Sequence, residues 1–168
     1  AREWQDPTIE TLLQRTGLAD YVAVEREKSG YNWFLQKKIY ENSEGRSCLP
    51  IYDFCFIDGA KNWTIDSAAF FLVDKLLKDG GWILFDDLQW TYQSKLDEGK
   101  TKSDGVHLSE MAEDELQRPH LELIYQLLVM QHPSYSNFFV RDYWWAWAQK
   151  SASGRREVQL ETSQRCLD

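Results

Sequence analysis

The chain has 168 residues, of which 43% are hydrophobic and 14% aromatic, and its formal net charge is −8. This length and apolar content predict one folded domain with its own core and exclude a chain that is disordered throughout. The acidic balance and the absence of a basic stripe argue against a nucleic-acid partner. No apolar run is long enough to span a membrane, and no signal-peptide pattern is present.

The three cysteines, Cys48, Cys55 and Cys166, are odd in number and form no CxxC pair. Cys55 lies inside an apolar run and is typical of a small buried hydrophobic residue. A chain without a disulfide framework indicates a reducing compartment, so we expect a cytoplasmic protein.

The first part of the chain predicts a helix, a strand and a second helix. Asp6 is a good helix cap, Pro7 suits the first helical position, and Gly17 is expected to end that helix. Residues 21–24, all apolar, predict a short strand. Apolar spacing then predicts a helix over residues 31–40.

Residues 52–92 predict a strand, a helix and a second strand. The strands, residues 52–57 and 82–85, show almost no polar alternation, which is typical of strands buried on both faces. Residues 65–77 between them have apolar side chains at helical spacing. The pair Gly80-Gly81 is expected to end the helix.

Acidic residues follow both strands: Asp58 after the first, and Asp86 and Asp87 after the second. Ligands of open parallel sheets bind at the carboxyl ends of the strands. Three carboxylates gathered there repel one another unless a cation or a proton joins them. The pattern therefore predicts a divalent-metal site, and oxygen ligands suit Mg²⁺, Ca²⁺ or Mn²⁺ rather than Zn²⁺. The alternative is that Asp86 and Asp87 simply end a strand in solvent.

The remaining segments complete a mainly parallel α/β sheet with flanking helices, because helices and strands alternate along the chain. We expect the domain to span residues 1–150 and to end in a β-hairpin, with a flexible tail beyond it. The expected segments are a polar loop at 93–105, a short acidic helix at 109–115, a helix at 119–131, hairpin strands at 135–140 and 143–149, and the tail at 151–168.

Two motifs carry a resemblance to a known family. Asp58-Gly59-Ala60-Lys61 and Asp86-Asp87 resemble the strand ends of class I S-adenosylmethionine-dependent methyltransferases. They are most similar to the metal-dependent O-methyltransferases of the catechol and caffeoyl-CoA kind, which end one strand with Asp-x-x-Lys and the next with Asp-Asn or Asp-Asp. The tryptophan-rich residues 144–148 fit the antiparallel strand pair that closes that fold. The resemblance implies a Rossmann-like sheet with a C-terminal antiparallel hairpin.

The resemblance implies a role for each acidic residue and for the lysine. Asp58, Asp86 and Asp87 would bind a divalent cation, usually Mg²⁺. Lys61 would accept the proton of a substrate hydroxyl or stabilise the resulting oxyanion. The alternative for Lys61 alone is an ordinary surface lysine.

The resemblance also implies contacts with S-adenosylmethionine and with the methyl acceptor. Glu3, Ser29, Tyr31 and Asp58 would contact the cofactor, with Glu3 at the ribose and Tyr31 near the adenine. Trp63 and Trp90 would stack on a flat substrate or on the adenine, and the alternative for both is packing.

The sequence departs from the family in one respect: it contains neither the first strand nor the glycine-rich loop that accommodates the methionine part of the cofactor. We therefore expect an N-terminally truncated domain and keep two functions open. One is S-adenosylmethionine-dependent O-methylation of a small hydroxylated substrate, if the cofactor half is supplied. The other is a non-catalytic methyltransferase-like domain that acts by assembly. Because the missing strands would leave a sheet edge unpaired, we expect a homodimer.

Overall fold

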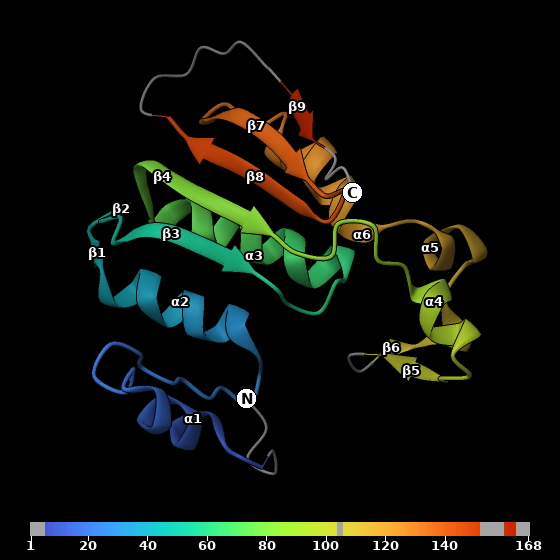
Figure 1. Cartoon of the computed structure of the whole chain (residues 1–168). Coiled ribbons are helices and arrows are strands. Elements are labelled where there is room, and N and C mark those ends of the chain that lie inside the picture. The colour runs from blue at the N-terminus through green and yellow to red at the C-terminus, as the bar shows by residue number, and fades with distance from the viewer. Residues whose placement is uncertain (1–5, 104–105, 152–159, 164–168) are drawn as a thin grey trace.

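A five-stranded sheet forms the centre of the computed structural model, which describes residues 6–103, 106–151 and 160–163 (Figure 1). The strand order is β3-β4-β8-β7-β9. β3 and β4 are parallel, β8 is antiparallel to both of its neighbours, and β9 is parallel to β7. This confirms the predicted α/β fold with a closing hairpin. The bounds are β3 Tyr52–Ile57, β4 Leu77–Phe85, β7 Tyr135–Arg141, β8 Trp145–Lys150 and β9 Leu160–Ser163.

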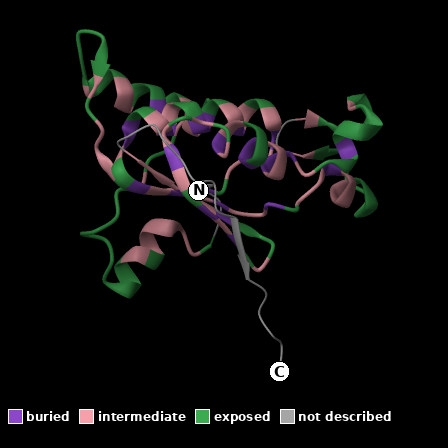
Figure 2. Cartoon of the chain, turned by 90° about the horizontal axis from the view of Figure 1, so that it is seen from above, coloured by how far each residue is buried: buried purple, intermediate pink, exposed green. Residues whose placement is uncertain are grey.

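Helices α3 (Trp63–Leu76) and α6 (His120–Ile124) pack together, and α2 (Tyr31–Glu41) packs beside α3. A π-helical turn, Tyr125–Val129, continues α6. Residues with no exposed surface line the contact between this layer and the sheet, and Figure 2 shows them along the inner side of the helices. They include Ala69, Phe70, Leu76, Ile83, Phe85, Ile124, Ala146 and Ala148.

The opposite face of the sheet is much less buried, which corrects one expectation. Side chains alternate along β3, so Cys55 and Ile57 belong to the core, whereas Phe54 and Phe56 are 48% and 51% exposed. The prediction that this strand is buried on both faces was therefore wrong for the described residues. Both faces of a parallel pair are normally covered, so the exposure of these rings is unusual.

The loop after Asp58 leads into helix α3, and Asn62 caps the N-terminus of that helix. The Asn62 Oδ1 atom accepts hydrogen bonds from the backbone N–H groups of Thr64 and Ile65, at 2.9 and 3.2 Å. The helix therefore starts two residues earlier than predicted. It is followed directly by β4, and Gly80-Gly81 lies inside that strand instead of ending the helix.

The N-terminal segment also differs from the prediction. Helix α1 (Ile9–Thr16) is capped by Thr8 instead of Asp6, and Gly17 ends it with a φ of 70°, as expected. Residues 21–24 form no strand, although a short strand was predicted there.

Residues 92–117 are more structured than the expected polar loop and acidic helix. Buried Tyr92, Leu108 and Leu116 form a small second core there. Its elements are α4 Tyr92–Asp97, β5 Lys102–Ser103, β6 Val106–His107, a 3₁₀ turn Leu108–Glu110 and α5 Glu113–Gln117. A further small hairpin pairs β1 (Ser43–Glu44) with β2 (Ser47–Cys48).

Part of the C-terminal segment belongs to the sheet. Residues 160–163 form β9, so that part of the expected flexible tail pairs with the sheet, and the rest of the tail lies outside the described residues. None of the helices in the described part of the chain has both the length and the apolar character that a bilayer crossing requires.

Candidate functional site

The two strand ends bring three carboxylates together, as the sequence predicted. In the parallel register of β3 and β4, Ile57 lies opposite Phe85, so both strands end at one level. The backbone N–H of Asp86 donates to the carbonyl oxygen of Ile57 at 3.1 Å. Ligand oxygens of Asp58, Asp86 and Asp87 all lie within 4.8 Å of one another.

Lys61 places an ammonium group among these carboxylates. Its Nζ atom lies 2.8 Å from Asp58 Oδ1 and 3.1 Å from Asp87 Oδ2, and its side chain is only 14% exposed. Burial alone would lower the pKa of Lys61, but the hydrogen bonds to Asp58 and Asp87 outweigh burial and raise that pKa above its usual value. Lys61 therefore carries its proton at neutral pH.

The backbone at this cluster is in an unfavourable conformation at two positions. Lys61 and Asp87 both have a φ of 56°, in the left-handed region. This conformation costs a non-glycine residue about 1–2 kcal/mol. It turns the chain sharply after each strand, and the two side chains meet across the sheet edge. Strain of this kind clusters at functional sites, where surrounding contacts hold it in place.

Trp145 at the start of β8 is a site residue that the sequence reasoning missed. Its Nε1–H donates to Asp86 Oδ1 at 2.7 Å, and the backbone N–H of Asp87 donates to the same oxygen at 2.8 Å. These two donors fix the orientation of the Asp86 carboxylate. The sequence placed Trp145 only in the tryptophan-rich hairpin strand, although its position at the start of the strand that neighbours β4 could have indicated the contact.

The buried carboxylate of Asp66 holds the loop that carries Lys61. Asp66 has no exposed surface, and it accepts hydrogen bonds from the Tyr31 hydroxyl and, at 2.8 Å, from the backbone N–H of Asn62. Burial raises the pKa of Asp66, while the hydrogen bond from Tyr31 acts to lower it. The backbone N–H of Ala60 also donates to the Tyr31 oxygen, at 3.4 Å.

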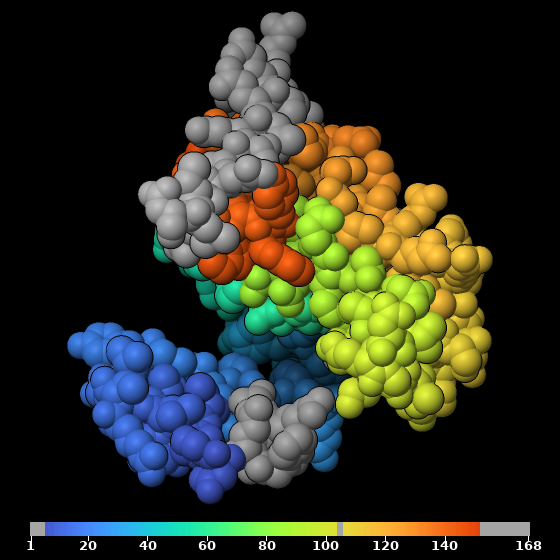
Figure 3. All heavy atoms as spheres, turned by 45° about the vertical axis from the view of Figure 1, so that its right-hand side comes forward, coloured from blue at the N-terminus to red at the C-terminus, as the bar shows by residue number. Residues whose placement is uncertain are grey.

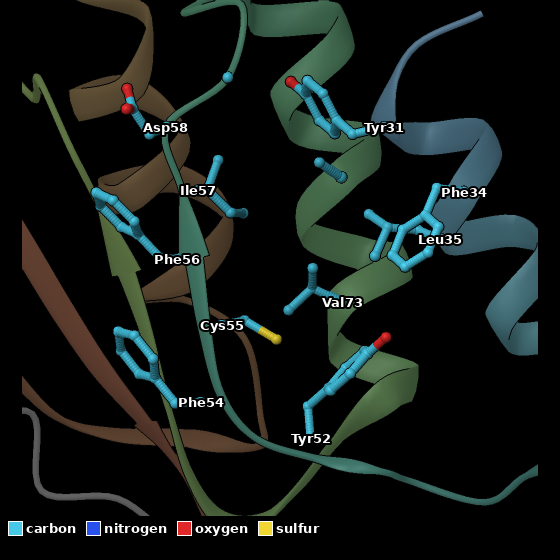
Figure 4. Close-up of a pocket in the computed structure, with 12 residues that line it drawn as sticks. Tyr31, Phe34, Leu35, Tyr52, Phe54, Cys55, Phe56, Ile57, Asp58 and Val73 are labelled. Carbon is cyan, nitrogen blue, oxygen red and sulfur yellow. The ribbon is translucent and has the colours of Figure 1, made fainter. Parts of the chain in front are cut away.

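Gly59 is required by this arrangement. A Cβ atom on Gly59 would lie 2.3 Å from the Tyr31 hydroxyl oxygen and 2.7 Å from Asp66 Oδ1. The loop between Asp58 and Lys61 is thus packed directly against the Tyr31–Asp66 pair. Tyr31 lies at the end of a groove that also includes Asp58 (Figure 4).

Replacing Tyr31 by phenylalanine is expected to destabilise the protein by about 1–3 kcal/mol at pH 7, because the buried Asp66 carboxylate loses a donor. Without that donor the folded-state pKa of Asp66 rises further. The penalty applies to the ionised carboxylate, so the loss should shrink as the pH falls toward 5. Urea unfolding at both pH values measures this difference. Tyr40→Phe, at a side chain that is 79% exposed, is the control. A loss that is independent of pH would contradict the account.

The two tryptophans predicted to contact substrate are largely engaged in packing. Trp63 is partly buried against the main core, and its backbone N–H donates to His120 Nδ1 at 3.1 Å. Trp90 packs on Tyr92, with ring centroids 4.8 Å apart. Their role at a substrate stays a prediction.

The residues predicted to contact the cofactor are only partly assembled. Asp58 and Tyr31 lie at the same end of β3, whereas Ser29 is an exposed residue of the loop before α2. Glu3 lies outside the described residues.

The acidic cluster has the donor set of a site for a hard divalent cation. It offers only carboxylate oxygens, which Mg²⁺, Ca²⁺ and Mn²⁺ prefer, and it lacks the imidazole or thiolate ligands typical of Zn²⁺. Lys61 neutralises part of the charge of Asp58 and Asp87, and a bound cation would replace these ion pairs. The three carboxylates therefore fit a divalent cation.

Comparison with known proteins identifies a shared fold. No protein-family model and no curated protein sequence matches the chain. A solved structure, the O-methyltransferase from Bacillus cereus in complex with SAH, is similar with a TM-score of 0.56 and 20% identity. The match covers 90% of this chain and 60% of that one, so the chain spans less than two thirds of that enzyme. The chain thus shares its α/β fold with this O-methyltransferase, in agreement with the fold that the sequence motifs implied.

Proposed function

We propose that this chain carries the metal- and acceptor-binding part of an S-adenosylmethionine-dependent O-methyltransferase that acts on a small hydroxylated substrate. The observation that supports this most is the convergence of three carboxylates and Lys61 at the ends of β3 and β4. The shared fold with an O-methyltransferase in complex with SAH supports the same reaction class. Because the chain matches 60% of that enzyme, the activity is proposed for this chain together with a cofactor-binding half.

Asp58, Asp86 and Asp87 are the residues that would hold Mg²⁺ or another divalent cation in this proposal. When bound, such a cation lowers the pKa of a hydroxyl group that it coordinates. Trp145 and the Asp87 amide contribute by fixing the Asp86 carboxylate before any ligand arrives. Hydrogen-bond donors that orient a metal-binding carboxylate typically improve metal affinity about 10- to 100-fold.

Lys61 is assigned the stabilisation of the acceptor oxyanion. The sequence left open whether this residue accepts a proton or stabilises negative charge. Its ion pairs with Asp58 and Asp87 place a positive charge beside the proposed acceptor position, which supports the second role. The Tyr31–Asp66 pair would keep Lys61 in place by holding the loop from Asp58.

The cofactor would supply an activated methyl group, so the protein has mainly to orient it toward the acceptor. Asp58, Tyr31 and Ser29 are proposed as contacts of S-adenosylmethionine, and Glu3 is proposed for its ribose. Trp63 and Trp90 are proposed as the aromatic surface on the acceptor side.

Calorimetry with S-adenosylmethionine, in the presence and in the absence of Mg²⁺, tests this function. We expect Mg²⁺ to bind the chain alone, and any binding of S-adenosylmethionine to strengthen when Mg²⁺ is present, because Asp58 is proposed as a contact of both. Asp79→Asn, at an exposed carboxylate in β4, should leave both titrations unchanged. If Mg²⁺ gives no binding signal, Asp58, Asp86 and Asp87 do not form the proposed metal site, and the proposal is wrong.

A second candidate function is a non-catalytic domain that acts by assembly. The observation that favours it is the outer edge of β3, which pairs with no strand in the described part of the chain. This hypothesis requires a partner at the outer edge of β3 and no bound cofactor.

A further inference from the structure

Lys61 holds two of the three proposed metal-binding carboxylates in ion pairs. Its Nζ atom lies 2.8 Å from Asp58 Oδ1 and 3.1 Å from Asp87 Oδ2. A carboxylate oxygen that accepts a hydrogen bond from an ammonium group has fewer lone pairs left for a metal ion. Two positive charges at the same carboxylates also repel each other. Lys61 and a divalent cation therefore compete for this cluster.

The third carboxylate of the cluster is held by a different kind of donor. Asp86 Oδ1 accepts hydrogen bonds from Trp145 Nε1–H and from the backbone N–H of Asp87, at 2.7 and 2.8 Å. Both donors are neutral, so they orient the carboxylate without repelling a cation that binds to it. Metal-binding carboxylates are commonly held by such hydrogen bonds. The charged Lys61 has no way to orient a carboxylate without also repelling the cation.

The carboxylates are open to solvent, whereas the lysine is not. The side chains of Asp58 and Asp87 are 49% and 38% exposed, and that of Lys61 is 14% exposed. A dissolved cation can therefore reach the carboxylates while Lys61 is still paired with them. Its arrival brings two positive charges together at the same oxygens.

The backbone before Lys61 is held in place by packing. Gly59 has no space for a Cβ atom, because Tyr31 and Asp66 lie against it. Lys61 itself adopts a φ of 56°, a conformation that a non-glycine residue keeps only where its surroundings fix it. This part of the loop therefore has little room to shift when a cation binds.

The backbone after Lys61 is held as well. Asn62 caps helix α3, and its Nδ2 atom donates to the Tyr92 hydroxyl at 3.1 Å. Tyr92 belongs to the small core of residues 92–117, the unit that stands beside the strand ends (Figure 3, yellow-green to yellow). The ammonium group can therefore leave the carboxylates only by rotation of the flexible lysine stem, which keeps it at the rim of the cluster.

We propose that Lys61 competes with the divalent cation, so that its ammonium group must leave Asp58 and Asp87 before a cation can coordinate all three carboxylates. This inference rests on the proposed function. The displaced ammonium stays beside the cluster and becomes available to the acceptor oxyanion. Cation binding therefore precedes the action of Lys61 on the acceptor, because Lys61 is otherwise held in its two ion pairs.

The affinity for Mn²⁺, measured by calorimetry at pH 7, tests the proposal. Lys61→Met should bind Mn²⁺ at least about tenfold more tightly than the wild-type chain, because the competing charge is removed. Lys78→Met is the matched control. Lys78 also forms an ion pair, with Asp53 at 2.9 Å, and its side chain is 45% exposed. Both substitutions remove one positive charge, and Lys78→Met should leave the affinity unchanged.

The sign of the change separates competition from support. If Lys61 oriented the carboxylates for the metal, its removal would weaken binding. An affinity of Lys61→Met that equals or falls below that of the wild type overturns the proposal and leaves the metal site itself in place. If neither variant nor the wild type binds Mn²⁺, the proposal and the proposed metal site are both wrong.

Lysine labelling of the wild-type chain keeps the proposal testable even if Lys61→Met fails to fold. An amine-reactive ester and peptide mass spectrometry measure the reactivity of each lysine. Lys61 should react slowly without added metal and faster in saturating Mn²⁺, because its ammonium group leaves the two ion pairs. Lys78 is the internal control, and its labelling should not change. A labelling rate of Lys61 that Mn²⁺ leaves unchanged contradicts the proposed displacement.

Discussion

Asp86→Ala is expected to weaken the binding of a hard cation by at least about 10- to 100-fold, which is the range that even the outer contacts of a metal site contribute. The substitution removes one of the three carboxylates and also the acceptor that holds Trp145. Terbium luminescence measures the effect, because Tb³⁺ prefers oxygen ligands and a neighbouring tryptophan sensitises its emission. Mg²⁺ and Ca²⁺ should displace the probe from the wild-type chain.

The control for this experiment is Asp79→Ala, which removes the same charge from an exposed position in β4. It separates loss of the site from loss of net charge, since the chain carries −8 overall. If both variants bind Tb³⁺ equally well, the three carboxylates do not act as one site.

Phe85→Ala is expected to destabilise the protein by about 3–5 kcal/mol, the usual cost of deleting a buried aromatic ring. Phe85 has no exposed surface and packs edge-on against Tyr125 at 6.3 Å. Since small domains have about 5–15 kcal/mol of stability in total, this loss is a large fraction. Urea unfolding measures this loss. The slope of the unfolding free energy against urea concentration should be the same for the variant and the wild type.

Phe56→Ala is the matched control on the other face of the sheet. Phe56 lies on the neighbouring strand, opposite Leu84 and one position from the level of Phe85, but it is 51% exposed. Its loss should cost about 1 kcal/mol, the average for a point substitution. Equal losses for the two variants would contradict the finding that the helices cover only one face of the sheet.

The strand–helix–strand unit could be predicted from the sequence because its signals are local. Apolar runs stop at Asp58 and at Asp86, and an apolar helical repeat lies between them. Parallel strands joined by a helix place their carboxyl ends at one edge, so the convergence of the acids follows from the topology. The terminal hairpin could also be predicted from the sequence, since only Arg141 and Asp142 separate its two apolar runs.

What could not be predicted depends on neighbours that a sequence pattern does not specify. Phe54 and Phe56 have the composition of a strand buried on both faces, but burial requires a layer on each side. Residues 21–24 have strand-forming side chains but form no strand. Gly80-Gly81 looked like a helix end, whereas both lie within β4 at a shift of its register against β3, where Gly80 adopts a φ of 80°.

The contacts that fix the site were also beyond the sequence, because they join distant positions. Trp145 lies 59 residues from Asp86, and Tyr31 lies 35 residues from Asp66. Neither pair has a spacing that indicates contact. Both become neighbours only after β8 pairs with β4 and α2 packs on α3.

Asp58, Asp86 and Asp87 are expected to form one cation site at the ends of β3 and β4. Anomalous scattering from a crystal soaked in Mn²⁺ locates such an ion without reference to activity. We expect a peak within coordination distance of all three carboxylates, which disappears in Asp86→Ala. A map without a peak there, in which Lys61 still bridges Asp58 and Asp87, would contradict this expectation.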